Sequence, residues 1–192
     1  MLAQTLSASL LGVDGVPVRV EVDVAFGLPS LTIVGMAGSQ VQEARERVRS
    51  ALRNSGFELP ARRITVNLAP ADLPKDGTAY DLAIAVGILA ASGQLPDDAR
   101  LADVALLGEL ALDGAIRPVT GVMSLVAAAR AAGTGGVIVP AGDEVEATCV
   151  AGIDILPAAR LGSAVAHLAG VRSLPVAAPG AAATWAPPAG VP

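Results

Sequence analysis

The sequence predicts one domain of the α/β or α+β class, because strand-like and helix-like segments alternate along it. Valine stands at every second position from Val16 to Val24, which is the period of a half-buried strand. From Ser39 to about Asn54 the apolar residues recur three and four positions apart, as in an amphipathic helix. A second helix, made mostly of small residues, is expected from about Thr78 to Ala91.

The first part of the chain is expected to form three strands. Residues 1–12 and 16–26 predict a β-hairpin, with Val13-Asp14-Gly15 as its turn. A short third strand is expected over Leu31–Val34, after the turn at 27–30.

The helix that follows carries its own start signal. Ser39 is expected to cap it, and Gln42, three positions later, completes a capping box. Glu43 and Arg47 stand four positions apart, which predicts an ion pair on the exposed side of the helix.

The rest of the chain continues the alternation of strands and helices. The Asp113-Gly114 pair marks a tight hairpin turn within this part. Strands are expected at 64–68, 104–108, 137–139 and 153–156, the hairpin turn at 112–115, and helices at 78–91, 121–132, within 141–150 and at 161–168.

Composition limits the classes of function. Of the 192 residues 53% are apolar but only 2% aromatic, so the core must consist of Ala, Val, Leu and Ile. The net charge of −5 provides no general basic field for nucleic acid. The single cysteine, Cys149, excludes a disulfide within the chain and fits a reducing cytosol. No signal peptide is read, and the longest uncharged apolar run, 82–96, is too short to span a bilayer. We therefore expect a cytoplasmic protein that does not enter the membrane.

The last residues differ in composition from the rest. Residues 173–192 contain five prolines, no charged residue and no periodic pattern of apolar residues. They predict a Pro/Ala-rich linker or disordered tail behind a domain of residues 1–172. Such a tail suggests a chain that continues.

The stretch around the only lysine holds the best information about function. Lys75 belongs to a loop, Pro74-Lys75-Asp76-Gly77, between a strand that ends near Leu68 and the helix expected from Thr78. Loops that lead into a helix N-terminus often build binding sites, because the free backbone N–H groups there point outward.

This loop resembles the catalytic segment of the Lon-type Ser-Lys proteases. In that family Pro-Lys-Asp-Gly is followed two positions later by the nucleophilic serine, and that place is Ala79 here. A second block, Gly108 to Val119, also resembles Lon. In Lon proteases the helix that follows this block carries the dyad lysine, and that place is Met123 here. The resemblance therefore implies degenerate dyad positions, because alanine lacks a nucleophilic atom and methionine cannot act as a base.

The pair Tyr80-Asp81 follows the loop. With this pair the chain resembles the N-terminal domain of the ComM/YifB group, which are Mg-chelatase-related (ChlI-type) AAA+ proteins, more closely than it resembles the Lon proteases. Further matching blocks lie at Ser7–Gly15, Gly27–Gly35 and Glu43–Arg49, so the resemblance covers about residues 1–170. It implies a Lon-protease-like domain of the ribosomal S5 domain 2-like fold, with a mixed sheet packed with helices. It also implies self-association as a hexamer, and ATP and Mg²⁺ used by a downstream AAA+ module.

Other polar residues of the sequence have both a chemical and a purely structural explanation. Thr78 and Lys75 could form an improvised dyad, but Thr78 as helix N-cap and Lys75 as a solvated loop charge are favoured. Asp72, Asp76 and Asp81 could together bind a metal ion. A structural role is favoured, in which Asp81 holds the backbone or the loop in place. One histidine, His167, is expected at the surface or packed rather than as a ligand. No Gly-x4-Gly-Lys-Ser/Thr loop for a nucleotide exists in this sequence.

Nucleic acid is the open case. Arg45, Arg49 and Arg53 recur at four-residue intervals on the first helix, and Arg62 and Arg63 follow soon after. Such a stripe can contact phosphates, although a solvated helix face is favoured and aromatic residues for stacking on bases are missing.

Two functions follow. The first is a non-catalytic Lon-like domain of a ComM/YifB-type AAA+ ATPase, serving assembly and DNA contact in a motor for DNA unwinding or branch migration. The alternative is a stand-alone Lon-like peptidase or peptide-binding module with a non-standard nucleophile. Nothing in the residues indicates a tetrapyrrole site.

Overall fold

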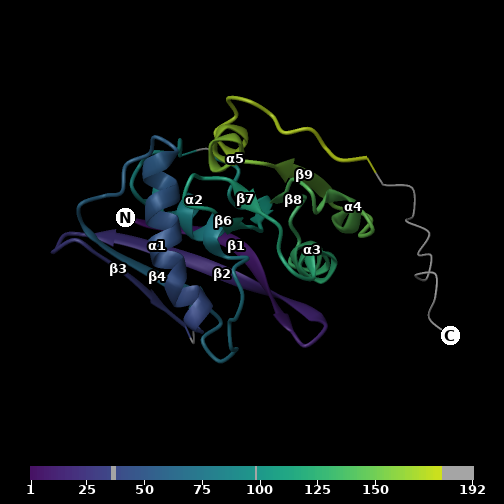
Figure 1. Ribbon diagram of the computed structural model, residues 1–192, viewed down its shortest axis with the longest axis horizontal. Coiled ribbons are helices and arrows are strands. Elements are labelled where there is room, and N and C mark those ends of the chain that lie inside the picture. The colour runs from purple at the N-terminus through teal and green to yellow at the C-terminus, as the bar shows by residue number, and fades with distance from the viewer. Residues whose placement is uncertain (36–37, 98, 179–192) are drawn as a thin grey trace.

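A mixed seven-stranded sheet organises the chain, which confirms the predicted class. The computed structural model describes residues 1–35, 38–97 and 99–178. The strand order is β3-β4-β2-β1-β5-β8-β9, and β2 is antiparallel to both of its neighbours while the other pairs are parallel. Figure 1 shows helices on both sides of this sheet. The strands of the sheet are β1 (Leu2–Leu11), β2 (Asp14–Ala25), β3 (Ser30–Val34), β4 (Arg63–Ala69), β5 (Val104–Leu106), β8 (Gly136–Pro140) and β9 (Asp154–Ala158).

The helices and a small second sheet follow the expected order. The predicted Asp113-Gly114 turn joins two short antiparallel strands, β6 (Glu109–Leu110) and β7 (Ile116–Arg117). None of the helices in the described ranges is long and apolar enough to cross a membrane. The helices are α1 (Ser39–Asn54), α2 (Asp81–Ala91), α3 (Val122–Ala131), α4 (Glu144–Ala147) and α5 (Leu161–Leu168).

The tight turn of the first hairpin lies earlier than predicted. It falls on Gly12 and Val13, and Gly12 has a φ of 66°, which glycine adopts without strain. Gly15 instead belongs to β2, where a Cβ atom would lie 2.0 Å from the Ser124 carbonyl oxygen. Its missing side chain therefore lets α3 approach the hairpin closely, rather than serving the turn.

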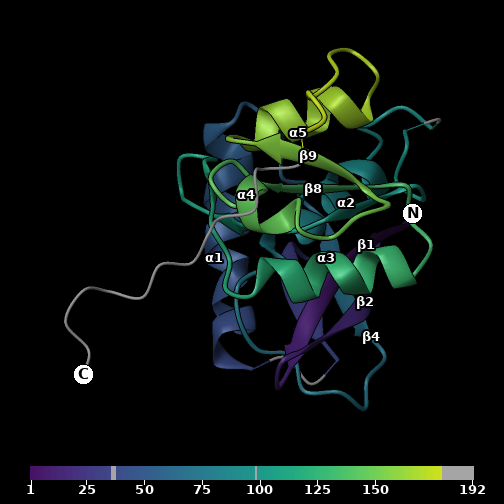
Figure 2. The same cartoon turned by 90° about the vertical axis from the view of Figure 1, so that its right-hand side faces the viewer.

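Two apolar cores lie on the two faces of the sheet. Along β8 the alternation is direct: Ile138 belongs to the core under α1, α2 and α5, whereas Val137 and Val139 belong to the core under α3 and α4. Figure 2 shows α3 lying across the β1–β2 hairpin, with α4 next to it. The helices thus form one layer on each side of the sheet.

Helix α2 is buried almost all round, which explains its small, apolar sequence. Of its eleven residues all but Ala90 are buried. A Cβ atom at Gly87 would lie 2.7 Å from a methyl group of Val22 on β2, so the glycine permits close contact between helix and sheet.

The predicted helix caps are wrong at both sites. Helix α1 is capped by Gly38 without a side-chain hydrogen bond, and the side-chain Nε2 of Gln42 donates to the Ile33 carbonyl of β3 instead (3.2 Å). Helix α2 begins at Asp81, not at Thr78. The Ala79 carbonyl accepts the Gly108 amide (3.1 Å), so it serves a tertiary contact instead of a helical bond, while the Thr78 carbonyl accepts the Asp81 amide in a turn (3.3 Å).

Candidate functional site

The loop before α2 is held by its lysine. Lys75 is fully buried, and its ammonium group donates hydrogen bonds to the Leu73 carbonyl (2.8 Å) and to the Pro70 carbonyl. Burial lowers the pKa of Lys75. The expected solvated loop charge is therefore wrong, because the side chain folds back under its own loop and pairs with backbone oxygens.

The same loop is fixed to the start of α1. The Gly38 amide donates to the Lys75 carbonyl (2.9 Å), and a Cβ atom at Gly38 would lie 2.1 Å from Asp76 Oδ1. Gly38 thus leaves room for the Asp76 carboxylate beside the first turn of α1.

A small cavity of about 280 Å³ lies at Ala79, where the resemblance places the nucleophile of the protease dyad. Ala79 is part of its wall, and Leu125 is the lining residue that α3 contributes, whereas Met123 is not a lining residue. The polar groups around the cavity are hydroxyls and carboxylates. The lining residues are Ala8, Ser9, Leu10, Asp76, Gly77, Thr78, Ala79, Glu109, Val119, Thr120 and Leu125.

The dyad lysine position lies at the surface. Met123 is 46% exposed on the first turn of α3, where its amide donates to Glu146 Oε1 (3.3 Å). Thr78 lines the cavity, but the Lys75 amine is turned to two backbone carbonyls of its own loop. The geometry gives no support to an improvised Thr78–Lys75 dyad.

Tyr80 is a buried polar residue next to this cavity. Its side chain is 1% exposed, and burial raises its pKa to about 12. Its hydroxyl lies near Ser9 and Asp76, and none of the residues placed in the structure gives it a hydrogen bond of ordinary geometry.

Asp81 links three elements through its buried carboxylate. It is 1% exposed and accepts two hydrogen bonds from Arg47 of α1, from Nε to Oδ2 (2.6 Å) and from Nη2 to Oδ1 (3.1 Å). The Leu110 amide of β6 also donates to Oδ2 (3.1 Å). Burial raises the pKa of Asp81, although Arg47 and the Leu110 amide oppose the shift.

Sequence reasoning missed the main partner of Arg47. The expected pair with Glu43 is present but long (3.8 Å), whereas Arg47 is mainly bound to Asp81. A signal was available: an aspartate at the head of an apolar helix needs a cationic partner if it is buried.

The remaining metal-ligating candidates do not come together. Asp72 and Asp76 are exposed, whereas Asp81 is paired with Arg47. Within the described ranges no three His, Cys, Asp or Glu side chains are grouped to hold a metal ion. His167 is half-buried, and its Nδ1 accepts a hydrogen bond from the Leu174 amide (3.0 Å).

The segment after α5 lies against the domain as far as it is described. Besides the Leu174 contact, the Ala177 amide donates to the Ile155 carbonyl of β9 (2.8 Å). Residues 173–178 therefore run along the β9 edge; residues 179–192 of the expected tail lie outside the described residues.

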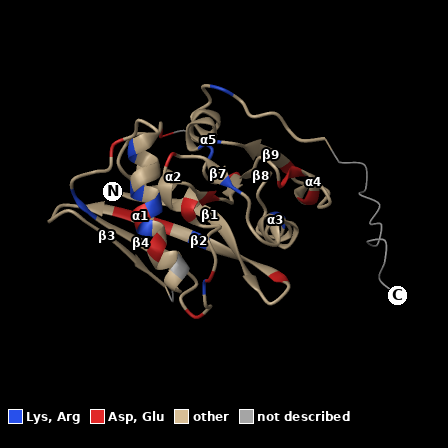
Figure 3. Cartoon of the chain, viewed as in Figure 1, with Lys and Arg blue, Asp and Glu red and all other residues tan. Residues whose placement is uncertain are grey.

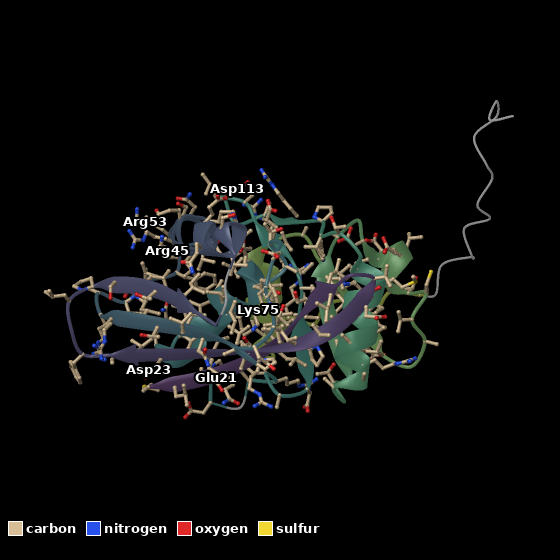
Figure 4. The ribbon with its side chains drawn as sticks, turned by 90° about the horizontal axis from the view of Figure 1, so that it is seen from below. Glu21, Asp23, Arg45, Arg53, Lys75 and Asp113 are labelled. Carbon is tan, nitrogen blue, oxygen red and sulfur yellow. The ribbon has the colours of Figure 1, made fainter. Side chains whose placement is uncertain are left out.

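The five arginines proposed for nucleic acid fall into two places. Arg45 and Arg53 are exposed on α1, where Figure 4 shows them on the same side of the molecule. Arg49 between them is half-buried, and its Nε is buried without a hydrogen bond from the residues described. Arg62 and Arg63 lie instead where β4 begins, beside the β2–β3 turn.

One aromatic residue does accompany the arginines. Phe26 is 86% exposed, and the Arg62 guanidinium lies 4.8 Å from its ring centroid. The expectation that no aromatic is available near the basic residues is therefore wrong for this turn.

Comparison with known proteins gives a consistent result. The profile described as subunit ChlI of Mg-chelatase matches residues 20–143. The uncharacterized protein YifB of Escherichia coli (strain K12) is 48% identical over 164 residues, which cover 85% of this chain and 32% of YifB. Competence protein ComM of Haemophilus influenzae is 50% identical over 129 residues, covering 67% of this chain and 25% of ComM.

A protease relative supports the fold. Lon protease 2 of Bacillus subtilis is 32% identical over 148 residues, covering 70% of this chain and 25% of the protease. The mixed sheet with helices on both faces fits the Lon-like fold that this relation predicts. The chain spans between a quarter and a third of the length of these three relatives. It belongs to the ChlI family of Mg-chelatase-related proteins, together with YifB and ComM.

Proposed function

We propose that this chain is a non-catalytic Lon-like domain of a ComM/YifB-type AAA+ ATPase, and that it serves assembly and DNA contact in a cytoplasmic motor that unwinds DNA or migrates branches. The observation that carries the proposal is Ala79 in the wall of a protease-like cavity. Ala79 carries only a methyl group at the place where the resemblance puts the nucleophile.

The use of ATP and Mg²⁺ is assigned to a downstream module. A P-loop lysine must reach the phosphates of the nucleotide. The only lysine here is fully buried, bound to the Pro70 and Leu73 carbonyls, and followed by Asp76. The residues of this chain therefore do not fit a Walker A site.

The absence of peptidase chemistry has a direct test. A broad peptide library is incubated with the wild-type chain and with Thr78→Val, which removes the hydroxyl at the cavity. We expect no cleavage by either protein. Cleavage by the wild type that disappears in Thr78→Val would establish a peptidase with a threonine nucleophile and contradict the proposal.

DNA contact is assigned to the exposed face of α1. Arg45 and Arg53 lie on this face, and Arg47, between them in sequence, is engaged with Asp81. A short basic row on a net-acidic protein binds phosphates weakly and in a salt-dependent manner, because binding releases counterions from the DNA.

The test compares Arg45→Ala/Arg53→Ala with Arg19→Ala/Arg172→Ala, a control that removes two exposed arginines away from α1. Binding to a short duplex is measured between 50 mM and 200 mM salt. We expect the α1 variant to lower the slope of log K against log salt by about 2, at roughly 0.9 per phosphate contact. An equal loss in both variants would indicate a general charge effect and would remove α1 from the proposal.

A further inference from the structure

Two large apolar side chains and two arginines occupy one end of the sheet. Phe26 and Leu28, in the turn between β2 and β3, are 86% and 88% exposed. Arg62 stacks on the Phe26 ring, and the Arg63 side chain is close to Gly27 of the same turn. We name this end, formed by Phe26, Leu28, Arg62 and Arg63, the arginine tip.

The opposite end combines apolar residues with carboxylates. The β1–β2 turn is tied to α3, because the Ser124 hydroxyl donates to the Val13 carbonyl (2.7 Å), and α3 is tied to α4 through Met123 and Glu146. These contacts join side chains of three elements into one surface, which we name the carboxylate face; all its members are exposed except Asp143 and Glu144, which are half-buried. Its apolar members are Leu11, Val13, Met123 and Val145, and its acidic members are Asp14, Asp143, Glu144 and Glu146.

Three of the four carboxylates of this face are held in place by backbone N–H groups. Asp143 accepts from the Val119 amide (2.9 Å), Glu144 from the Gly142 amide, and Glu146 from the Met123 amide. A carboxylate oxygen has two lone pairs, and each of these groups carries a second oxygen. They can therefore bind an arginine while keeping these contacts.

The two surfaces cannot meet within one molecule. In the β1–β2 hairpin Leu2 pairs with Asp23 near the arginine tip, and Leu11 pairs with Asp14 at the carboxylate face. At about 3.3 Å per residue, a strand of this length separates them by roughly 30 Å. Figure 3 shows red on α4 at the right, and blue in the segment leading into β4 at the left.

We infer that the arginine tip of one copy of this chain docks on the carboxylate face of the next copy. This rests on the self-association in the proposed function and specifies its geometry. Charge complementarity supports it, because two arginines meet four carboxylates while Phe26 and Leu28 meet four exposed apolar side chains. Such a head-to-tail contact joins different surfaces, so it extends into a ring if the rotation closes and into a filament if it does not.

A second copy fits the tip better than nucleic acid does. Phosphates would pair with Arg62 and Arg63 but would leave the exposed Leu28 side chain in water. A copy of the chain covers the apolar and the charged groups of both ends at once.

Complementation between two defective chains tests the inference. Phe26→Ser/Arg62→Glu removes the tip, and Met123→Ser/Glu146→Arg removes the face. Val171→Ser/Arg172→Glu is the matched control, because it exchanges one exposed apolar residue and one exposed arginine elsewhere. Sedimentation velocity of the 192-residue chains, over a concentration series at 50 mM and 500 mM salt, gives the mass of each species.

We expect the wild type and the control to associate at 50 mM salt and to dissociate at 500 mM, where charges are screened within about 4 Å. Each defective chain alone should sediment as a monomer. Their mixture should form a 1:1 dimer that grows no further, because only one tip and one face remain. Circular dichroism confirms that the variants are folded.

Three outcomes would overturn the inference. They are a wild type that stays monomeric throughout, a defective chain that still associates like the wild type, and a mixture that stays monomeric although the wild type associates. A monomeric wild type whose tip variant loses DNA binding would assign the tip to nucleic acid. The α1 and peptide tests do not depend on the tip or the face, so they would stand.

Discussion

Arg47 Nε lies 2.6 Å from Asp81 Oδ2, and this ion pair joins α1 to the first residue of α2. The same carboxylate oxygen accepts the Leu110 amide, so three segments that are distant in sequence meet at one side chain. Asp81 directly follows the loop that carries Ala79 and Tyr80. The pair therefore fixes that loop relative to the layer of helices.

Removing Arg47 should destabilise the fold strongly. Arg47→Met leaves a buried carboxylate with only a backbone N–H, and we expect a loss of about 3 kcal/mol in the free energy of unfolding. Urea denaturation at pH 7 measures it. Arg47→Met/Asp81→Asn should recover part of the loss, since the buried charge is then absent. A double variant less stable than Arg47→Met would contradict this account.

The effect of Arg47→Met should depend on pH. Burial raises the pKa of Asp81 in the folded protein, and loss of Arg47 must raise it further, because Arg47 favours the charged form. A carboxyl group whose pKa is higher in the folded than in the unfolded state stabilises the folded protein at low pH. That contribution to the free energy of unfolding is lost as the pH rises through the folded pKa. The stability difference between wild type and Arg47→Met should therefore shrink from pH 7 towards pH 4. A difference that is constant over this range would exclude Asp81 as its source.

Lys75 should resist chemical modification in the folded protein. Its amine is buried and bound to two carbonyls, whereas amine reagents require an accessible, unprotonated group. We expect mass mapping to find label on the Met1 amine alone, and on both amines in urea. Arg53→Lys adds an exposed lysine as a positive control. If Lys75 were labelled as fast as the new lysine of Arg53→Lys, the buried position of the Lys75 amine would be contradicted.

A methyl group at Gly87 should disturb the contact between α2 and β2. Gly87→Ala places Cβ 2.7 Å from a Val22 methyl group. Overpacking typically costs 1–3 kcal/mol, of which about 1 kcal/mol is offset by the helix propensity of alanine. We expect a net loss of about 1 kcal/mol. In a double-mutant cycle, Gly87→Ala should cost less on a Val22→Ala background, and additive effects would rule out this contact as the cause.

His167 should link the segment after α5 to pH. Burial, and to a lesser degree Arg100, lower its pKa below 6.5, and only a deprotonated Nδ1 accepts the Leu174 amide. The unfolded chain then takes up the proton first, so stability is lost as pH falls through 6.5 and the loss ends below the folded pKa. His167→Gln should remove this component. The protection of the Leu174 amide from hydrogen exchange, relative to the intrinsic rate at each pH, should fall over the same pH range in the wild type and show no such pH-dependent step in the variant.

The sequence by itself determined the order and type of the elements. Period-two valines and three-to-four spacing are local signals, and both depend only on which face of a strand or helix is apolar. The motif around Lys75 likewise pointed to the family that the comparisons show, and it predicts that Ala79 stands at the place of the nucleophile.

Only the tertiary structure decided where the polar side chains point. The sequence predicts Lys75 as a solvated charge of a surface loop. In the structure its side chain is buried, because its own loop supplies two carbonyls that accept hydrogen bonds from the amine. Arg47 was paired with Glu43 by its spacing, yet it binds Asp81, which lies 34 residues away. Local spacing cannot predict such partners, since the low-dielectric interior rewards a paired charge much more than the surface does.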